Sequence, residues 1–175
     1  MKQYLSNNIV TLRAIEPEDI ELLYTWENDP ETWDVSHTLV PYSKYILALY
    51  IKNSDKDIYE SKQLRLMIEN SDGKTVGAID LFDFDPHHSR AGIGILIHNH
   101  SNRSKGYASA TLELLISYCF NKLNIHQLYA NIESNNKISL SLFNKCKFTI
   151  CGTKREWLRS SEGWKDELML QRINI

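Results

Sequence analysis

The sequence HNHSNRSKGYASATLELLISYCF, at residues 98–120, carries the clearest structural signal in the chain. A basic loop with one glycine passes directly into a segment whose apolar residues recur at helical spacing, which predicts a helix over 107–121. The apolar residues of this segment are Ala108, Leu112, Leu115, Ile116 and Cys119. The first backbone N–H groups of a helix are unpaired and lie at its positive end. The stretch therefore suits a bound phosphate, although a solvated basic loop capped by glycine explains it equally well when it is taken alone.

Two common nucleotide-binding motifs do not fit this stretch. A P-loop needs a lysine directly after its second glycine, whereas Lys105 precedes Gly106. A dinucleotide-binding fold needs three glycines after its first strand, whereas Gly92 and Gly94 lie inside a predicted strand with no third glycine at the required spacing. The sequence therefore predicts neither hydrolysis of a nucleoside triphosphate nor binding of a dinucleotide.

The length and composition are typical of one globular domain over residues 1–175. The chain has 175 residues, of which 42% are hydrophobic and 24% charged, and its formal net charge is −2. Proteins dedicated to nucleic acid usually carry a clear positive excess, so nucleic acid is not an expected partner. No apolar run approaches the roughly 20 residues that cross a bilayer, and the first residues have no apolar core of signal-peptide length. We therefore expect no membrane partner and a cytoplasmic location.

Alternating apolar residues and turn signals predict about seven strands with four helices among them. Strands are expected over 9–15, 63–69, 75–84, 90–97, 126–133, 148–158 and 164–173, and helices over 16–26, 43–51, 107–121 and 135–146. Helices that interleave with an antiparallel meander predict a layered α+β domain, in which helices flank a mixed, mostly antiparallel twisted sheet.

The three cysteines follow no metal-binding or redox spacing. We expect Cys119, Cys146 and Cys151 to be buried thiols that pack as small apolar side chains. His98 and His100 are spaced closely enough to bind a metal together, but no third ligand can be assigned, so no metal site is predicted.

Two motifs in register give the chain a family resemblance. The loop from Arg103 to Ala108 has the form [R/Q]-x-x-G-x-[G/A], and NNKISLSLFNKCKF at 135–148 is similar to the pattern N-x-x-[S/A]-x-x-[L/I]-[Y/F]-x-K-x-G-F. With the expected helix and strand between them, these motifs resemble the GNAT superfamily of N-acetyltransferases. The likeness covers nearly the whole chain. LRAIEPEDIELLYTWENDPE and REWLRSSEGWKDELML resemble the branch that contains spermidine and ribosomal-protein N-terminal acetyltransferases.

The resemblance implies the GNAT acyl-CoA N-acyltransferase fold, with acetyl-CoA as co-substrate. It places the cofactor arm in a V-shaped opening between the strand that ends at Ile97 and the strand over 127–133. The residues that it implies for cofactor binding are Leu96, Ile97, His98, Arg103, Ser104, Lys105, Gly106, Tyr107, Ala108, Asn136 and Ser139. Relatives often dimerise, so a homodimer is an expectation for this chain.

The implied reaction is direct transfer of an acetyl group to a primary amine, which belongs to a polyamine, another small amine or a protein N-terminus. A base has to accept a proton from the amine, and we expect it to be Asp83 or, as a second candidate, His98. Strict alternation puts Asp83 and Asp85 on one face of their strand and Asp80 on the other.

Four acidic residues are expected at the acceptor site. They are Glu27, Glu31, Asp80 and Asp83. Each has a plainer interpretation, as a solvated carboxylate at a strand edge or as part of a capped helix end, and the histidines can be ordinary surface residues.

Phe143 and Lys147 depart from the family pattern. Many relatives carry, at the position of Phe143, a tyrosine that is thought to protonate the departing thiolate, and phenylalanine has no such proton. Lys147 replaces the glycine with which the helix ends in the left-handed region. An alternative function follows from Phe143, namely an acetyl-CoA-binding or sensing module without catalysis. We favour the enzyme, because acid–base groups supply only about 10²–10⁴ in rate and a missing acid can be bypassed.

Overall fold

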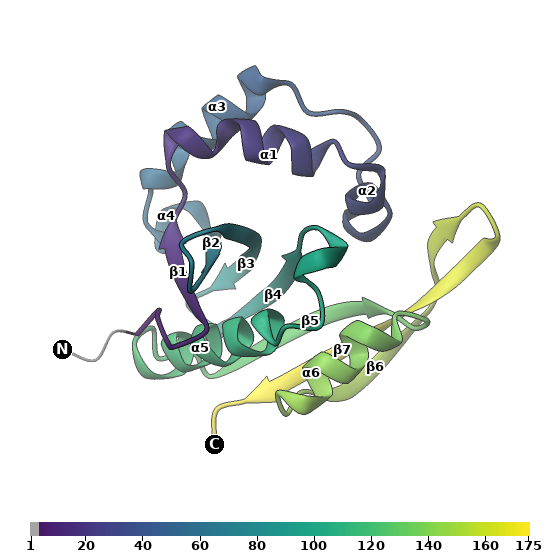
Figure 1. Ribbon diagram of the computed structural model, residues 1–175. Coiled ribbons are helices and arrows are strands. Elements are labelled where there is room, and N and C mark those ends of the chain that lie inside the picture. Colours follow the sequence, from purple (N-terminus) through teal and green to yellow (C-terminus); the bar gives the residue numbers. More distant parts are fainter. Residues whose placement is uncertain (1–3) are drawn as a thin grey trace.

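The computed structural model describes residues 4–175, which form one seven-stranded sheet with helices on both faces (Figure 1). The strands are β1 (Val10–Ala14), β2 (Leu64–Asn70), β3 (Thr75–Asp85), β4 (Arg90–Ile97), β5 (Gln127–Glu133), β6 (Thr149–Ser160) and β7 (Gly163–Ile173). The helices are α1 (Ile20–Glu27), α2 (Pro30–Ser36), α3 (Lys44–Lys52), α4 (Ile58–Ser61), α5 (Tyr107–Asn121) and α6 (Lys137–Lys145). Short 3-10 turns cover Pro17–Asp19, Asn53–Asp55 and His100–Asn102. None of the helices in this part of the chain is long and apolar enough to cross a membrane.

The strand order is β1-β2-β3-β4-β5-β7-β6, and every neighbouring pair is antiparallel except β4 and β5. The parallel pairing of β4 with β5 is confined to Arg90–Gly92 and Gln127–Tyr129. Beyond Gly92 the two strands diverge, as Figure 1 shows. This divergence matches the V-shaped opening that the family resemblance implies.

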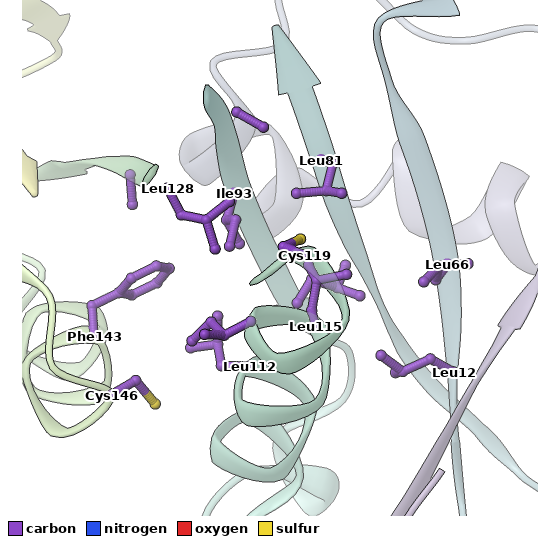
Figure 2. Close-up of a cluster of buried hydrophobic side chains, with 14 of the residues drawn as sticks. Leu12, Leu66, Leu81, Ile93, Leu112, Leu115, Cys119, Leu128, Phe143 and Cys146 are labelled. Carbon is purple, nitrogen blue, oxygen red and sulfur yellow. The ribbon is translucent and has the colours of Figure 1, made fainter. Parts of the chain in front are cut away.

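Two apolar cores hold the helices against the sheet. On one face, Leu112, Leu115 and Cys119 of α5 pack among side chains of the central strands, as drawn in Figure 2. The three are at most 1% exposed, which confirms the helical face predicted from their spacing. On the other face, Leu23 of α1 and Leu47 of α3 pack with side chains of the central strands. The site lies where this second layer meets the open ends of β4 and β5.

The structure corrects the prediction for one cysteine. Cys119 and Cys146 are buried as expected, but Cys151 is exposed. Cys151 lies in β6, which is an edge strand of the sheet and is exposed along most of its length. The four predicted helices also omit α2, which begins at Pro30 shortly after α1 ends at Glu27. Asp29 caps this helix by accepting a hydrogen bond from the Glu31 N–H.

Candidate active site

A cavity of about 450 Å³ lies between α1, α2 and the diverging ends of β4 and β5, and extends to α6 and β7. Its apolar wall includes Leu23, Trp26, Ile93, Leu96 and Phe143. Its charged wall consists of the carboxylates of Glu27, Asp80, Glu133 and Glu167 with the cations Arg65 and Lys165. Among the predicted site residues, Glu27, Asp80, Leu96, His98, Asn136 and Ser139 line this cavity.

The N-terminus of α5 has unpaired hydrogen-bond donors. Gly106 is its N-cap, with φ 81 and no side-chain cap, and the first turn contains no acidic residue. The first helical bond runs from the Ala110 N–H to the Gly106 carbonyl oxygen, at 3.0 Å. Within residues 4–175, the backbone N–H groups of 104–109 meet no protein acceptor. The residues fit a diphosphate, because the donors and the positive end of the helix dipole remain available while Arg103 and Lys105 flank them.

The edge of β4 offers a second set of backbone donors. The His98 N–H donates to the Val76 carbonyl oxygen of β3 at 2.9 Å. Because successive N–H groups of a strand alternate in direction, those of Ile95 and Ile97 point away from β3 and toward the opening. The backbone N–H of Ile97 is therefore directed into the opening, whereas that of His98 is not.

Asn136 and Ser139 line the opening from the start of α6. The Asn136 side-chain oxygen accepts a hydrogen bond from the Ser139 N–H at 3.1 Å and so caps the helix. The cap leaves the Asn136 amide N–H₂ and the Ser139 hydroxyl as the groups that can reach a bound molecule.

His98 is a buried imidazole stacked on an indole. Its ring lies 4.0 Å from that of Trp26 with 4° between the planes, and the residue is 8% exposed. Burial lowers the pKa of His98 to about 4, and the positive charges of Arg65 and Arg103 add to this, while Asp29 opposes it. The imidazole is therefore neutral at pH 7 and can accept a proton only briefly.

Arg65 binds two of the predicted acceptor-site carboxylates, which the sequence did not suggest. Its Nε and Nη2 donate to Asp80 at 2.7 and 3.0 Å, and its Nη1 donates to Glu27 at 2.5 Å. Burial disfavours the charge of Arg65, but Asp80 and Glu27 outweigh it, so its pKa lies above the ordinary value. The three groups keep one net negative charge beside Trp26.

Asp83 lies apart from this cavity. The ladder between β3 and β4 is irregular between Phe82 and Asp85, and Asp83 has φ 49. The Asp83 carboxylate accepts a hydrogen bond from the Tyr129 hydroxyl at 3.1 Å, and both residues line a separate hollow with Asp85. Burial, with the nearby Asp83, raises the pKa of Tyr129 to about 12.

The bulge also makes the prediction of strict alternation wrong. Asp80 and Phe82 are two residues apart and share one face of β3, and the Phe82 ring lies 5.8 Å from that of Tyr129. The bond to Tyr129 brings Asp83 to this same face, rather than to the face opposite Asp80. The bulge adds one residue to β3, so the side chains after it no longer follow the alternation predicted from the sequence.

Glu31 belongs to α2 and contacts the cofactor loop instead of the cavity. It lies 3.0 Å from His100 Nε2 and 3.5 Å from Arg103 Nη2. Glu31 and Arg103 line a smaller hollow of about 140 Å³ next to His98. Glu31, which was expected at the acceptor site, therefore contacts Arg103, which was expected at the cofactor site.

Glu133 and Glu167 are cavity residues that the sequence reasoning missed. They are direct partners in the β5–β7 ladder, where two like charges would repel. Lys165 contacts Glu133 at 2.8 Å and Lys154 contacts Glu167 at 2.7 Å, which offsets that repulsion. The signal was present in the sequence, because alternation along QLYANIE places Glu133 on the face opposite to the buried Leu128.

Phe143 is 3% exposed and packs edge-on against Phe148, with ring centroids 5.0 Å apart. Its ring lines the cavity but brings no hydroxyl group to it. The left-handed end of α6 is confirmed, since Lys147 has φ 64.

A family model described as "Acetyltransferase (GNAT) domain" matches residues 10–149. The chain belongs to the GNAT acetyltransferase family. This GNAT chain is 27% identical over 152 residues to spermidine N(1)-acetyltransferase of Escherichia coli (strain K12), covering 84% of this chain and 76% of that protein. It is 39% identical over 152 residues to an N-acetyltransferase 9-like protein of Nematostella vectensis, covering 83% of this chain and 77% of that one.

A solved structure of spermidine N-acetyltransferase from Vibrio cholerae, in complex with CoA and spermine, has a TM-score of 0.86 at 21% identity. The match covers 95% of this chain and 96% of that one, and it shows that the two share a fold. The fold class predicted from the sequence is thereby confirmed. As a GNAT member, the chain is an N-acetyltransferase that uses acetyl-CoA.

Proposed function

We propose that this acetyltransferase acts on a small cationic primary amine of the polyamine class. The observation that carries the proposal is the charged wall of the cavity, where four carboxylates outnumber two cations. Such a wall concentrates cations near the opening that receives the acetyl group. The names of the relatives from Escherichia coli and Vibrio cholerae agree with this substrate class.

The residues that would hold the cofactor are those whose hydrogen-bond donors meet no protein acceptor or line the cavity. The N–H groups of 104–109 with Arg103 and Lys105 would hold its diphosphate, and Asn136 and Ser139 would bond its arm. When bound, acetyl-CoA supplies a thioester whose acetyl carbon accepts the amine nitrogen. The Ile97 N–H, which points into the opening, would donate to the acetyl oxygen as its negative charge grows.

Two residues were candidates for the base, and their positions favour His98. The His98 imidazole lines the cavity, whereas the Asp83 carboxylate lines another hollow and is occupied by the Tyr129 hydroxyl. A neutral imidazole with a pKa of about 4 does not retain a proton, so we expect it to pass the amine's proton on to water.

The acceptor would be held by carboxylates that keep spare lone pairs. Glu27 and Asp80 each accept hydrogen bonds from Arg65, but each carboxylate has room for a further donor. Glu167, which lines the same cavity, would hold a second cationic nitrogen of the same molecule. We also propose that the protein associates with further copies of itself, since a related spermidine N-acetyltransferase from Vibrio cholerae is described as dodecameric.

The test is release of free CoA thiol from acetyl-CoA in the presence of a panel of amines. We expect spermidine and spermine to give a higher kcat/KM than a neutral aminosugar or a peptide N-terminus, and we expect this preference to shrink at high salt. Preference for the aminosugar or the peptide would contradict the proposed substrate class. Tight binding of acetyl-CoA without thiol release by any amine would support the sensing module instead.

A further inference from the structure

We propose that Lys165 is a catalytic residue that donates a proton to the departing CoA sulfur. The inference rests on the transfer reaction described above, in which the C–S bond breaks and sulfur takes the electron pair. A thiol has a pKa of about 8.5, so the sulfur leaves more readily if a nearby acid protonates it. The question is which group in the cavity wall can supply that proton.

Few side chains of the described cavity wall can act as this acid at neutral pH. Arg65 holds its protons too tightly, because two carboxylates raise its pKa. His98 is neutral, and His37 lines the cavity from the end of α2 and not from the strands that flank the expected thioester arm. The hydroxyls of Thr32, Ser36 and Ser139 are far too weak as acids, and Phe143 has no proton to give. Only Lys165, with its ammonium group, remains among the cavity-lining residues of 4–175.

The structure holds Lys165 at the open end of β5. Its Nζ lies 2.8 Å from Glu133, the last residue of that strand, and its side chain is 30% exposed. The turn after β5 is fixed beside it, because the Ser134 N–H donates to the Asp166 carbonyl oxygen at 2.9 Å. Asn136, which lines the cavity and begins α6, follows directly in this turn. Lys165 therefore stands beside the opening between β4 and β5, on the wall where the thioester arm is expected.

The proton balance closes with His98 and water as the other participants. The C–N bond to the neutral amine forms as the C–S bond breaks, and Lys165 gives a proton to sulfur. The new amide nitrogen loses its extra proton through His98 to water. The neutral Lys165 amine then regains a proton from solvent, which restores its ion pair with Glu133. Glu133 positions Lys165 in this scheme and does not itself react.

The variant Lys165→Arg distinguishes a role of Lys165 as an acid from a role as a cation that only supports the structure. Lys165→Arg keeps a positive charge opposite Glu133, but a guanidinium does not release its proton near neutral pH. We expect kcat to fall by ~10²-fold or more, with the dissociation constant of acetyl-CoA changed less than about threefold. Lys154→Arg is the matched control, since Lys154 also pairs with a glutamate on the same hairpin but does not line this cavity. The control should keep its kcat.

The pH profile gives a second readout. The wild-type kcat should fall on the alkaline side as Lys165 loses its proton, and this limb should be absent from Lys165→Met, measured after thermal melting has shown that the variant folds. A kcat within threefold of wild type in Lys165→Arg, or an unchanged alkaline limb in Lys165→Met, would overturn the inference. If the wild type itself releases no thiol with any amine, the failure lies with the proposed function and not with Lys165 alone.

Discussion

Replacing His98 by asparagine tests whether the fold suppresses protonation of this imidazole. An unfolded chain leaves the pKa of His98 near its ordinary value of 6.5, whereas burial against Trp26 lowers it to about 4 in the folded protein. Between these values the unfolded chain binds more protons than the folded one, so His98 costs stability as the pH falls from 6.5 to 4. Above pH 6.5 that cost is absent.

The linkage relation gives the size of the effect. With pKa values of 6.5 and about 4, acidification from pH 7.5 to pH 5 should remove ~2 kcal/mol of unfolding free energy through His98 alone. Other groups also titrate in this range, so the quantity to compare is the pH dependence of each variant. His98→Asn should lose about 2 kcal/mol less than wild type between the two pH values, because asparagine does not titrate.

Urea unfolding at pH 7.5 and pH 5, followed by circular dichroism, measures this difference directly. His126→Gln is the matched control, since His126 is exposed and lies outside the cavity. Equal losses of stability in wild type and His98→Asn would refute the argument, because they would mean that the folded state accepts a proton on His98 as easily as the unfolded chain.

Three further predictions concern other parts of the chain. Lys147→Gly should raise the unfolding free energy by up to ~1 kcal/mol in urea titrations, because φ 64 strains a residue with a Cβ, and Lys147→Ala should show no such gain. Gly106→Ala should weaken acetyl-CoA binding about five- to tenfold in calorimetry, because φ 81 costs a non-glycine residue ~1 kcal/mol, and unchanged affinity would show that the loop is not the binding element. Arg65→Gln should lower stability by ~3 kcal/mol or more at pH 7.5, because Glu27 and Asp80 lose their shared cation. An unfolding free energy of Arg65→Gln equal to that of wild type would contradict this explanation.

Local patterns in the sequence predict the parts of the fold that depend on local interactions. The α5 helix spans 107–121 as predicted, because its apolar spacing and the glycine before it act within a few residues. The prediction that the loop ahead of it holds a phosphate likewise rests on local features, since helix ends have unpaired N–H groups in any fold.

The missed parts of the site depend on contacts between distant residues. Arg65 and Glu27 are 38 positions apart, and their contact follows from the placement of α1 over β2. The bulge that brings Asp83 to the same face of β3 as Asp80 leaves no mark in an alternating sequence. Lys165 and Glu133 meet because β5 and β7 pair in one register, and no local pattern fixes that register.

The central claim is that the N-terminus of α5 holds the diphosphate of acetyl-CoA. A crystal structure of the protein with CoA bound tests it most directly. We predict that diphosphate oxygens will lie within hydrogen-bonding distance of the N–H groups of 104–109, with the arm of CoA between β4 and β5. A diphosphate bound elsewhere, with those N–H groups facing water or protein acceptors, would contradict the assignment of the cofactor site.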